Sequence, residues 1–120
     1  MNIKEKFKVI RNNYVINQVE NIVFPNFESS EMIRKKFIFT GRVQKVGFRL
    51  ELSLIAKKLG LTGWVKNTSQ GQVAAEIQGE KDKIDFLIKF MKSLKRIKIV
   101  KVEEHVIEVV KTEDEFKLIK

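Results

Sequence analysis

From residue 36 onward, the apolar residues follow two regular patterns. Some stretches alternate apolar with polar residues or are rich in Val and Ile, as β-strands are. In others, apolar residues recur every three or four positions, as on one face of an α-helix. The predicted strands span residues 36–43, 61–67, 72–78, 97–110 and 115–119, and the predicted helices span residues 50–59 and 81–94. The order of elements is therefore βαββαβ with a short final strand.

The two predicted helices have clear apolar faces. The first shows Phe48, Leu52, Ile55 and Leu59 at helical spacing, and Gly60 ends it. The apolar face of the second consists of Ile84, Leu87, Ile88, Met91 and Leu94. Two helices interleaved with an antiparallel or mixed sheet predict a ferredoxin-like α+β sandwich with both helices packed on one face.

Residues 1–35 show no single period. Val15, Val19, Ile22 and Val23 suit a short helix, whereas Tyr14, Ile16 and the run from Ile22 to Phe24 also suit a strand. The pattern leaves both alternatives open. The only proline, Pro25, begins a polar stretch that is typical of a linker. We therefore expect residues 1–35 to form an N-terminal extension and linker, and residues 36–120 to form one domain.

The composition narrows the chemistry. The chain has 24 basic and 15 acidic residues, a net charge of +9, no cysteine and one histidine. The charge favours an anionic ligand, although a lysine-rich surface alone accounts for much of it. Without cysteine there is no disulfide and no thiolate, and no metal-ligand spacing is present. No apolar run approaches the ~20 residues of a membrane span, and the N-terminus lacks a signal-peptide core, so we expect a cytoplasmic protein.

The run from Gly41 to Arg49 joins the first predicted strand to the first helix and contains two glycines and two arginines. A tight strand-to-helix turn directs several backbone N–H groups into one concavity, and the helix N-terminus adds its own N–H groups. Arg49 supplies a planar charged fork suited to phosphate. An arginine at a helix start is mildly unfavourable beside the helix dipole, which favours a bound anion.

Asn67 is the second candidate. It ends the predicted strand 61–67, and in a ferredoxin-like sandwich this strand end lies near the loop after the first strand. Its amide offers both an acceptor and a donor, although an asparagine that merely forms the turn is the alternative. No Walker loop and no Ser/His/Asp set is present, and His105, in mid-strand, is expected to be structural.

Residues 36–120 resemble the acylphosphatases, small enzymes that hydrolyse the carboxyl–phosphate bond of acyl phosphates. The resemblance rests on the loop 41–49 and on residues 63–67, followed by Gly71, Val73 and Gly79 at the family's spacing. It implies that Arg49 and Asn67 are catalytic, with Asn67 positioning the attacking water. It also implies that the phosphate is bound by Gln44, Lys45, Val46, Gly47, Phe48 and Arg49. A carboxylate is a good leaving group, so no metal and no cofactor are expected.

Lys45 departs from the family pattern, in which glycine is usual at this position. If the backbone there needs a positive φ, Lys45 carries about 1–2 kcal/mol of strain or the loop is reshaped. Alternatively, Lys45 adds a second cation at the rim of the loop.

Two other functions compete with acyl phosphate hydrolysis. One is a weakly active or inactive binding module for an anion or RNA. RNA-binding sheets stack bases on exposed aromatics, whereas Phe37 and Phe39 have no second aromatic-rich strand beside them. The other is an accessory domain, as in the larger carbamoyl-transfer proteins of hydrogenase maturation. We expect a monomer that acts on a small-molecule acyl phosphate, releases inorganic phosphate, and has no membrane or nucleic-acid partner.

Overall fold

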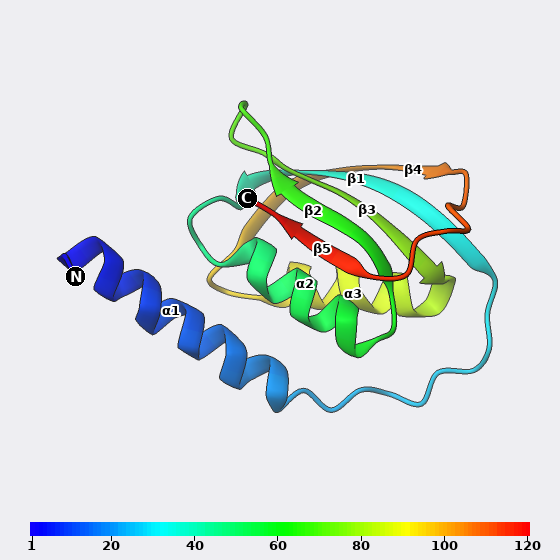
Figure 1. The fold of residues 1–120 in the computed structure, drawn as a ribbon, viewed down its shortest axis with the longest axis horizontal. Helices are drawn as coiled ribbons and strands as arrows, with labels where there is room; N and C mark the ends of the chain where they lie inside the picture. Colours follow the sequence, from blue (N-terminus) through cyan, green and yellow to red (C-terminus); the bar gives the residue numbers. More distant parts are fainter.

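The computed structural model describes residues 1–120 and contains one five-stranded sheet with helices on one face (Figure 1). The elements are α1 (Ile3–Glu20), β1 (Met32–Arg42), α2 (Phe48–Lys58), β2 (Thr62–Asn67), β3 (Val73–Glu80), α3 (Lys81–Ser93), β4 (Lys98–Ile107) and β5 (Phe116–Ile119). The strand order is β4-β1-β3-β2-β5. All neighbouring strands are antiparallel except β2 and β5, which are parallel. The prediction of a ferredoxin-like sandwich is confirmed.

The core lies between the sheet and the helices α2 and α3. Phe37 and Phe39 point from β1 into it and are 1% and 0% exposed. The ring of Phe39 packs against Phe48 at the start of α2, with centroids 4.9 Å apart. Because Phe37 and Phe39 are buried, neither ring offers a surface on which bases can stack.

Two strand boundaries differ from the prediction by more than two residues. The predicted strand 36–43 begins earlier, at Met32, and the predicted strand 97–110 ends at Ile107. The early end of β4 has a local cause, because Gln78 bonds both backbone groups of Val110. The Val110 N–H donates to Gln78 Oε1 at 2.7 Å, and Gln78 Nε2 donates to the Val110 carbonyl at 3.0 Å. These groups are thereby withheld from strand pairing.

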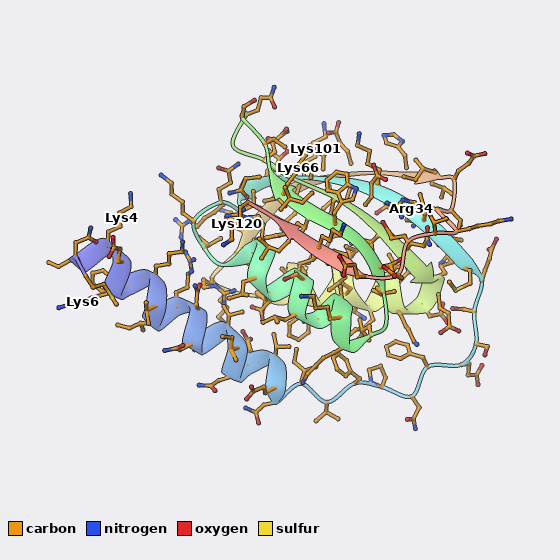
Figure 2. The ribbon with its side chains drawn as sticks, in the orientation of Figure 1. Lys4, Lys6, Arg34, Lys66, Lys101 and Lys120 are labelled. Atoms are coloured by element: carbon orange, nitrogen blue, oxygen red, sulfur yellow. The ribbon has the colours of Figure 1, made fainter.

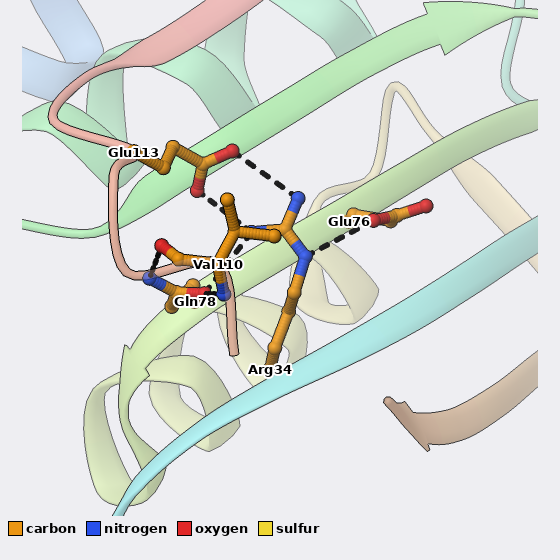
Figure 3. Close-up of polar contacts among 5 residues, drawn as sticks. All are labelled: Arg34, Glu76, Gln78, Val110 and Glu113. Carbon is orange, nitrogen blue, oxygen red and sulfur yellow. Dashed lines mark hydrogen bonds and ion pairs between the residues drawn. The ribbon is translucent and has the colours of Figure 1, made fainter. Parts of the chain in front are cut away.

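An arginine cluster fastens the segment after β4 to the sheet face opposite the helices (Figure 3). Arg34 is 2% exposed and lies 3.0 Å from Glu76 and 2.7 Å from Glu113. It also donates to Gln78 Oε1 at 3.2 Å. Burial lowers the pKa of Arg34, but the hydrogen bonds and charges of Glu113 and Glu76 outweigh burial and leave its pKa raised. We call Arg34, Glu76, Gln78, Val110 and Glu113 the Arg34 cluster.

The N-terminal segment forms a helix, which settles the choice that the sequence left open. The side chain of Asn2 caps α1 by accepting from the Glu5 N–H at 2.8 Å. Val15 and Val19 are buried against the rest of the chain, and Lys58 of α2 donates to the Val19 carbonyl at 3.0 Å. Figure 1 shows α1 beside α2, with its N-terminal half extending past the domain.

The segment from residue 21 to residue 31 returns the chain to β1 along α3. Phe24 and Phe27 both pack against the Phe86 ring in a T-shaped arrangement, with centroids 5.6 Å apart in each pair. The predicted linker is therefore packed by its aromatic residues. None of the helices combines the length and apolarity that crossing a membrane requires.

Candidate active site

A pocket of about 450 Å³ opens between the loop that follows β1, the end of β2 and helix α1. Of the predicted site residues, Lys45, Gly47, Phe48, Arg49 and Asn67 line it together. The end of β2 meets the loop because β2 and β1 flank β3 in the sheet.

The remaining two predicted site residues, Gln44 and Val46, do not line the pocket. The Gln44 amide is occupied elsewhere, since its Nε2 donates to the carbonyls of Thr68 and Gln72 at 2.9 and 2.8 Å. Gln44 therefore ties the loop to the β2–β3 hairpin. Its side chain is not free to bind a ligand, but its backbone N–H is.

The loop offers a run of unpaired donors. The backbone N–H groups of residues 44–47 donate no hydrogen bond within the chain. Lys45 and Gly47 both have positive φ, +63° and +79°. Left-handed residues curve the backbone so that successive N–H groups converge, which is the geometry of an anion-binding nest. The geometry of the loop is therefore compatible with a bound anion.

Lys45 is the only non-glycine residue with a positive φ in the chain. This conformation costs a side-chain-bearing residue roughly 1–2 kcal/mol. The loop thus keeps its left-handed conformation and bears the strain. Arg11 of α1 offsets part of it, because Arg11 Nη1 donates to the Lys45 carbonyl at 3.0 Å.

Arginines from two other segments bond backbone carbonyls of the loop. Arg11 bonds the carbonyl of Lys45, and Arg96, after α3, donates its Nε–H to the carbonyl of Val46. In a trans peptide the C=O and the following N–H point in opposite directions. Holding these two carbonyls therefore directs the N–H groups of Val46 and Gly47 away from the two arginines.

Arg96 is in turn held by a buried carboxylate. Glu51 in α2 is fully buried and lies 2.7 Å from Arg96 Nη2. With its amide nitrogen facing Glu51, Gln18 of α1 lies 3.2 Å from both carboxylate oxygens. Burial raises the pKa of Glu51, and the hydrogen bond and charge of Arg96 oppose that rise only in part.

Arg49 and Asn67 both have unused hydrogen-bonding capacity. Arg49 Nη1 donates to the Ile119 carbonyl at 2.9 Å, and no carboxylate pairs with its guanidinium. Asn67 Oδ1 is the only buried side-chain polar atom without a hydrogen-bond partner. Such an orphaned acceptor costs roughly 1–3 kcal/mol. The pocket is therefore lined by a cation without a carboxylate partner and by an asparagine whose buried Oδ1 is unpaired.

No acidic side chain and no histidine lines the pocket. His105 is exposed on β4, opposite Lys36 of β1. No group of three or more His, Asp or Glu side chains lies close enough to hold a metal ion.

Sequence reasoning missed the contributions of Arg11, Glu51 and Arg96. A signal for Glu51 exists, because it lies between Phe48 and Ile55 on the apolar face of α2, where a carboxylate needs a buried partner. For α1, the signal is Asn2 three residues before Glu5, a helix-start pattern. Nothing in the local sequence indicates that Arg11 reaches the loop.

Fold and site together define a ferredoxin-like domain with a basic pocket beside the loop that follows β1. The family model described as Acylphosphatase matches residues 35–118. An acylphosphatase of Clostridium beijerinckii is 39% identical over 88 residues, which cover 72% of this chain and 98% of that protein. The chain belongs to the acylphosphatase family. The predictions of this family and of an acylphosphatase enzyme are confirmed, and with them the hydrolysis of acyl phosphates.

Solved structures agree with this assignment. The crystal structure of an acylphosphatase from Bacillus subtilis matches with a TM-score of 0.68 and 25% identity, covering 75% of this chain and all of that one. Full-length HypF in a phosphate- and nucleotide-bound form matches with a TM-score of 0.68 and 29% identity. That match covers 79% of this chain but 13% of HypF, so the same domain also occurs inside a much longer protein.

Proposed function

We propose that this chain hydrolyses acyl phosphates with the phosphoryl group held by the loop 44–49 and by Arg49, and with the attacking water oriented by Asn67. The free N–H groups of residues 44–47 and the guanidinium would contact the non-bridging oxygens. These donors are fixed before the substrate binds, so they stabilise the charge of the transition state without reorganisation.

The reaction needs little more than this. The water oxygen attacks phosphorus, the bond between phosphorus and the acyl oxygen breaks, and the carboxylate departs with the bonding electrons. The protons of the water remain on the phosphate product. Because the conjugate acid of the leaving carboxylate has a pKa of about 4–5, no general acid is required. Positioning and charge stabilisation supply the catalysis.

The observation that carries this proposal is the unpaired Oδ1 of Asn67, buried in the same pocket as Arg49. An asparagine that served only to form the hairpin turn would bond its side chain to the local backbone. Here the acceptor is unused within the chain, as expected for an atom whose partner is a water molecule.

Hydrolysis of benzoyl phosphate without added metal tests the phosphate site. We expect wild-type turnover, and a loss on the order of 10²–10³ in Arg49→Ala, as for removal of a preorganised charge donor. Near-normal turnover in Arg49→Ala would refute the assignment. Inactive but folded wild-type protein would favour the binding-module alternative.

Asn67→Ala separates water positioning from phosphate binding. Turnover should fall while the inhibition constant of inorganic phosphate stays near the wild-type value. A parallel loss of phosphate binding would show that Asn67 holds the phosphoryl group and not the water.

We also propose that the enzyme acts as a monomer on free acyl phosphates, without nucleic acid. Sedimentation and a salt-dependent RNA-binding assay test it. The cytoplasmic location and the division of the chain at residue 35 stay predictions from the sequence.

A further inference from the structure

The active-site pocket holds more positive charge than one phosphoryl group requires. The basic residues that line it are Lys8, Arg11, Lys45, Arg49 and Lys120, and no acidic side chain lines it. None of the five takes part in an ion pair, whereas Arg34 and Arg96 elsewhere in the chain are paired with carboxylates. Unpaired like charges repel one another, and a bound anion relieves that repulsion.

Two of these cations come from α1. Lys8, Arg11 and Val15 follow one another at helical spacing, so they lie on one face of the helix. Val15 is fully buried and thereby turns this face toward the loop. Arg11 is fixed there by its bond to the Lys45 carbonyl, and its side chain lies beside Gly47. The pKa of Arg11 is lowered, by burial first and then by the charges of Arg96 and Arg49.

The pocket also continues along α1 toward the N-terminus of the helix. A second cavity, of about 650 Å³, shares Lys8, Arg11, Lys45, Arg49 and Asn67 with the first and extends to Lys4 and Phe7. Its one acidic side chain is Glu5. Figure 2 shows Lys4 and Lys6 on opposite sides of α1, and Lys120 near the loop between β1 and α2. A ligand whose phosphoryl group binds the loop therefore has room for its remaining part beside Lys8 and Arg11.

We propose that Lys8 and Arg11 form a second anion subsite, which selects acyl phosphates whose acyl part carries its own negative charge, such as a carboxylate. The inference rests on the proposed function, because it places the phosphoryl group at Arg49 and the loop. The helix α1 then acts as a specificity element of the active site. Arg11 has two roles, since it also holds the loop, whereas Lys8 makes no hydrogen bond within the chain.

The test compares succinyl phosphate, whose acyl part ends in a free carboxylate, with benzoyl phosphate, whose acyl part is uncharged. The readout is the ratio of kcat/KM for the two substrates. In Lys8→Ala this ratio should fall about 3- to 5-fold, the size of one partly solvated charge contact. In Lys8→Glu it should fall about 10-fold or more, because attraction becomes repulsion. Lys6→Ala is the matched control, from the same helix but outside both cavities, and should keep the wild-type ratio.

A binding measurement keeps the inference separate from catalysis. Calorimetry with 3-phosphonopropionate and with propylphosphonate should show tighter binding of the former to wild type, with the difference reduced in Lys8→Ala. Equal ratios in Lys8→Ala and Lys6→Ala, with equal binding of the two phosphonates, would overturn the subsite alone. A wild type that discriminates the phosphonates but hydrolyses neither substrate would retain the subsite and overturn the proposed function.

Discussion

Arg34 and Arg49 occupy opposite environments in the same small molecule. Arg34 is buried between Glu76, Glu113 and Gln78 on the open face of the sheet, and every neighbour is an acceptor (Figure 3). Arg49 begins α2 in a pocket lined by other cations, and its only partner is the Ile119 carbonyl. Arg34 is therefore paired with two carboxylates within the fold, whereas Arg49 is paired with none.

The charge of Arg34 is compensated within the fold, whereas the charge of Arg49 is not. Two carboxylates raise the pKa of Arg34, and its ion pairs close a segment of chain onto the sheet. The uncompensated charge at Arg49 contributes nothing comparable to folding and remains available to a ligand. We therefore expect substitutions at the two arginines to have opposite signatures in activity and stability.

The largest expected effect is on activity at Arg49. Arg49→Met should lower kcat/KM for benzoyl phosphate by a factor on the order of 10²–10³. The free energy of unfolding should change by no more than about 0.5 kcal/mol, because no buried partner is left behind. Steady-state kinetics and urea denaturation of the same preparation measure both. Arg42→Met, in the same segment, is the control; a large stability loss in Arg49→Met alone would contradict the comparison.

Arg34 should show the reverse. Arg34→Met leaves Glu76 and Glu113 without their cation, and breaking a buried pair in this way costs roughly 3–5 kcal/mol. Thermal unfolding should move down by on the order of 10 °C, while kcat/KM per folded molecule is retained. In the double variant Arg34→Met/Glu113→Gln, part of the loss should be recovered, as a double-mutant cycle would register. Strictly additive losses would show that the two residues act separately.

The buried ion pair of Glu51 and Arg96 extends the comparison of Arg34 with Arg49. Unlike the ion pairs of Arg34, it holds the loop of the candidate site, because Arg96 also bonds the Val46 carbonyl. The raised pKa of Glu51 means that the folded state holds this proton more firmly than the unfolded chain. Its contribution to stability is present at low pH and is lost as the pH rises through the folded pKa. The stability of wild type relative to Glu51→Gln should therefore fall from about pH 4.5, the ordinary pKa, toward neutrality.

Urea denaturation of both proteins across this pH range measures the difference. Asp82→Asn, an exposed carboxylate in α3, controls for general charge effects. A difference that grows with pH would mean that Arg96 outweighs burial and that the pKa of Glu51 is lowered.

The smallest expected effect is at Lys45. Lys45→Gly removes about 1–2 kcal/mol of left-handed strain but adds chain entropy to the unfolded state, which leaves a net gain of about 0.5 kcal/mol. A small rise in the melting temperature would register it. Lys45→Asn, which tolerates the same backbone angles, removes the charge without adding the entropy. A fall in melting temperature for both would mean that the lysine side chain itself stabilises the loop.

The fold could be predicted from the sequence because its elements are long and regular. The helices α2 and α3 each show an unbroken apolar stripe, and their predicted bounds differ little from those observed. The end of β4 could not be predicted in this way. It depends on Gln78 meeting Val110, and that contact exists only after the sheet has formed.

Part of the candidate site could likewise be predicted from local sequence patterns, and part could not. The loop with Arg49 and the strand end with Asn67 have recognisable local patterns, and the β-sheet order brings them to one pocket. The sequence of α1 shows no comparable pattern that would indicate its contact with the site. Exposed apolar residues such as Phe7 and Ile10 blur its periodicity, and only Val15 and Val19 are buried when it docks. Local sequence does not specify which face of such a helix packs.

Because few residues of α1 are buried, the docking of α1 can be coupled to ligand binding. A ligand that contacts both Lys8 and Arg49 joins α1 to the loop, so its binding energy is shared with the docking equilibrium. By linkage, the ligand strengthens docking by the same factor by which docking strengthens ligand affinity. The two valines that anchor α1 therefore tune affinity although neither lines the pocket. Loosening them would lower the affinity for substrates whose acyl part carries its own negative charge.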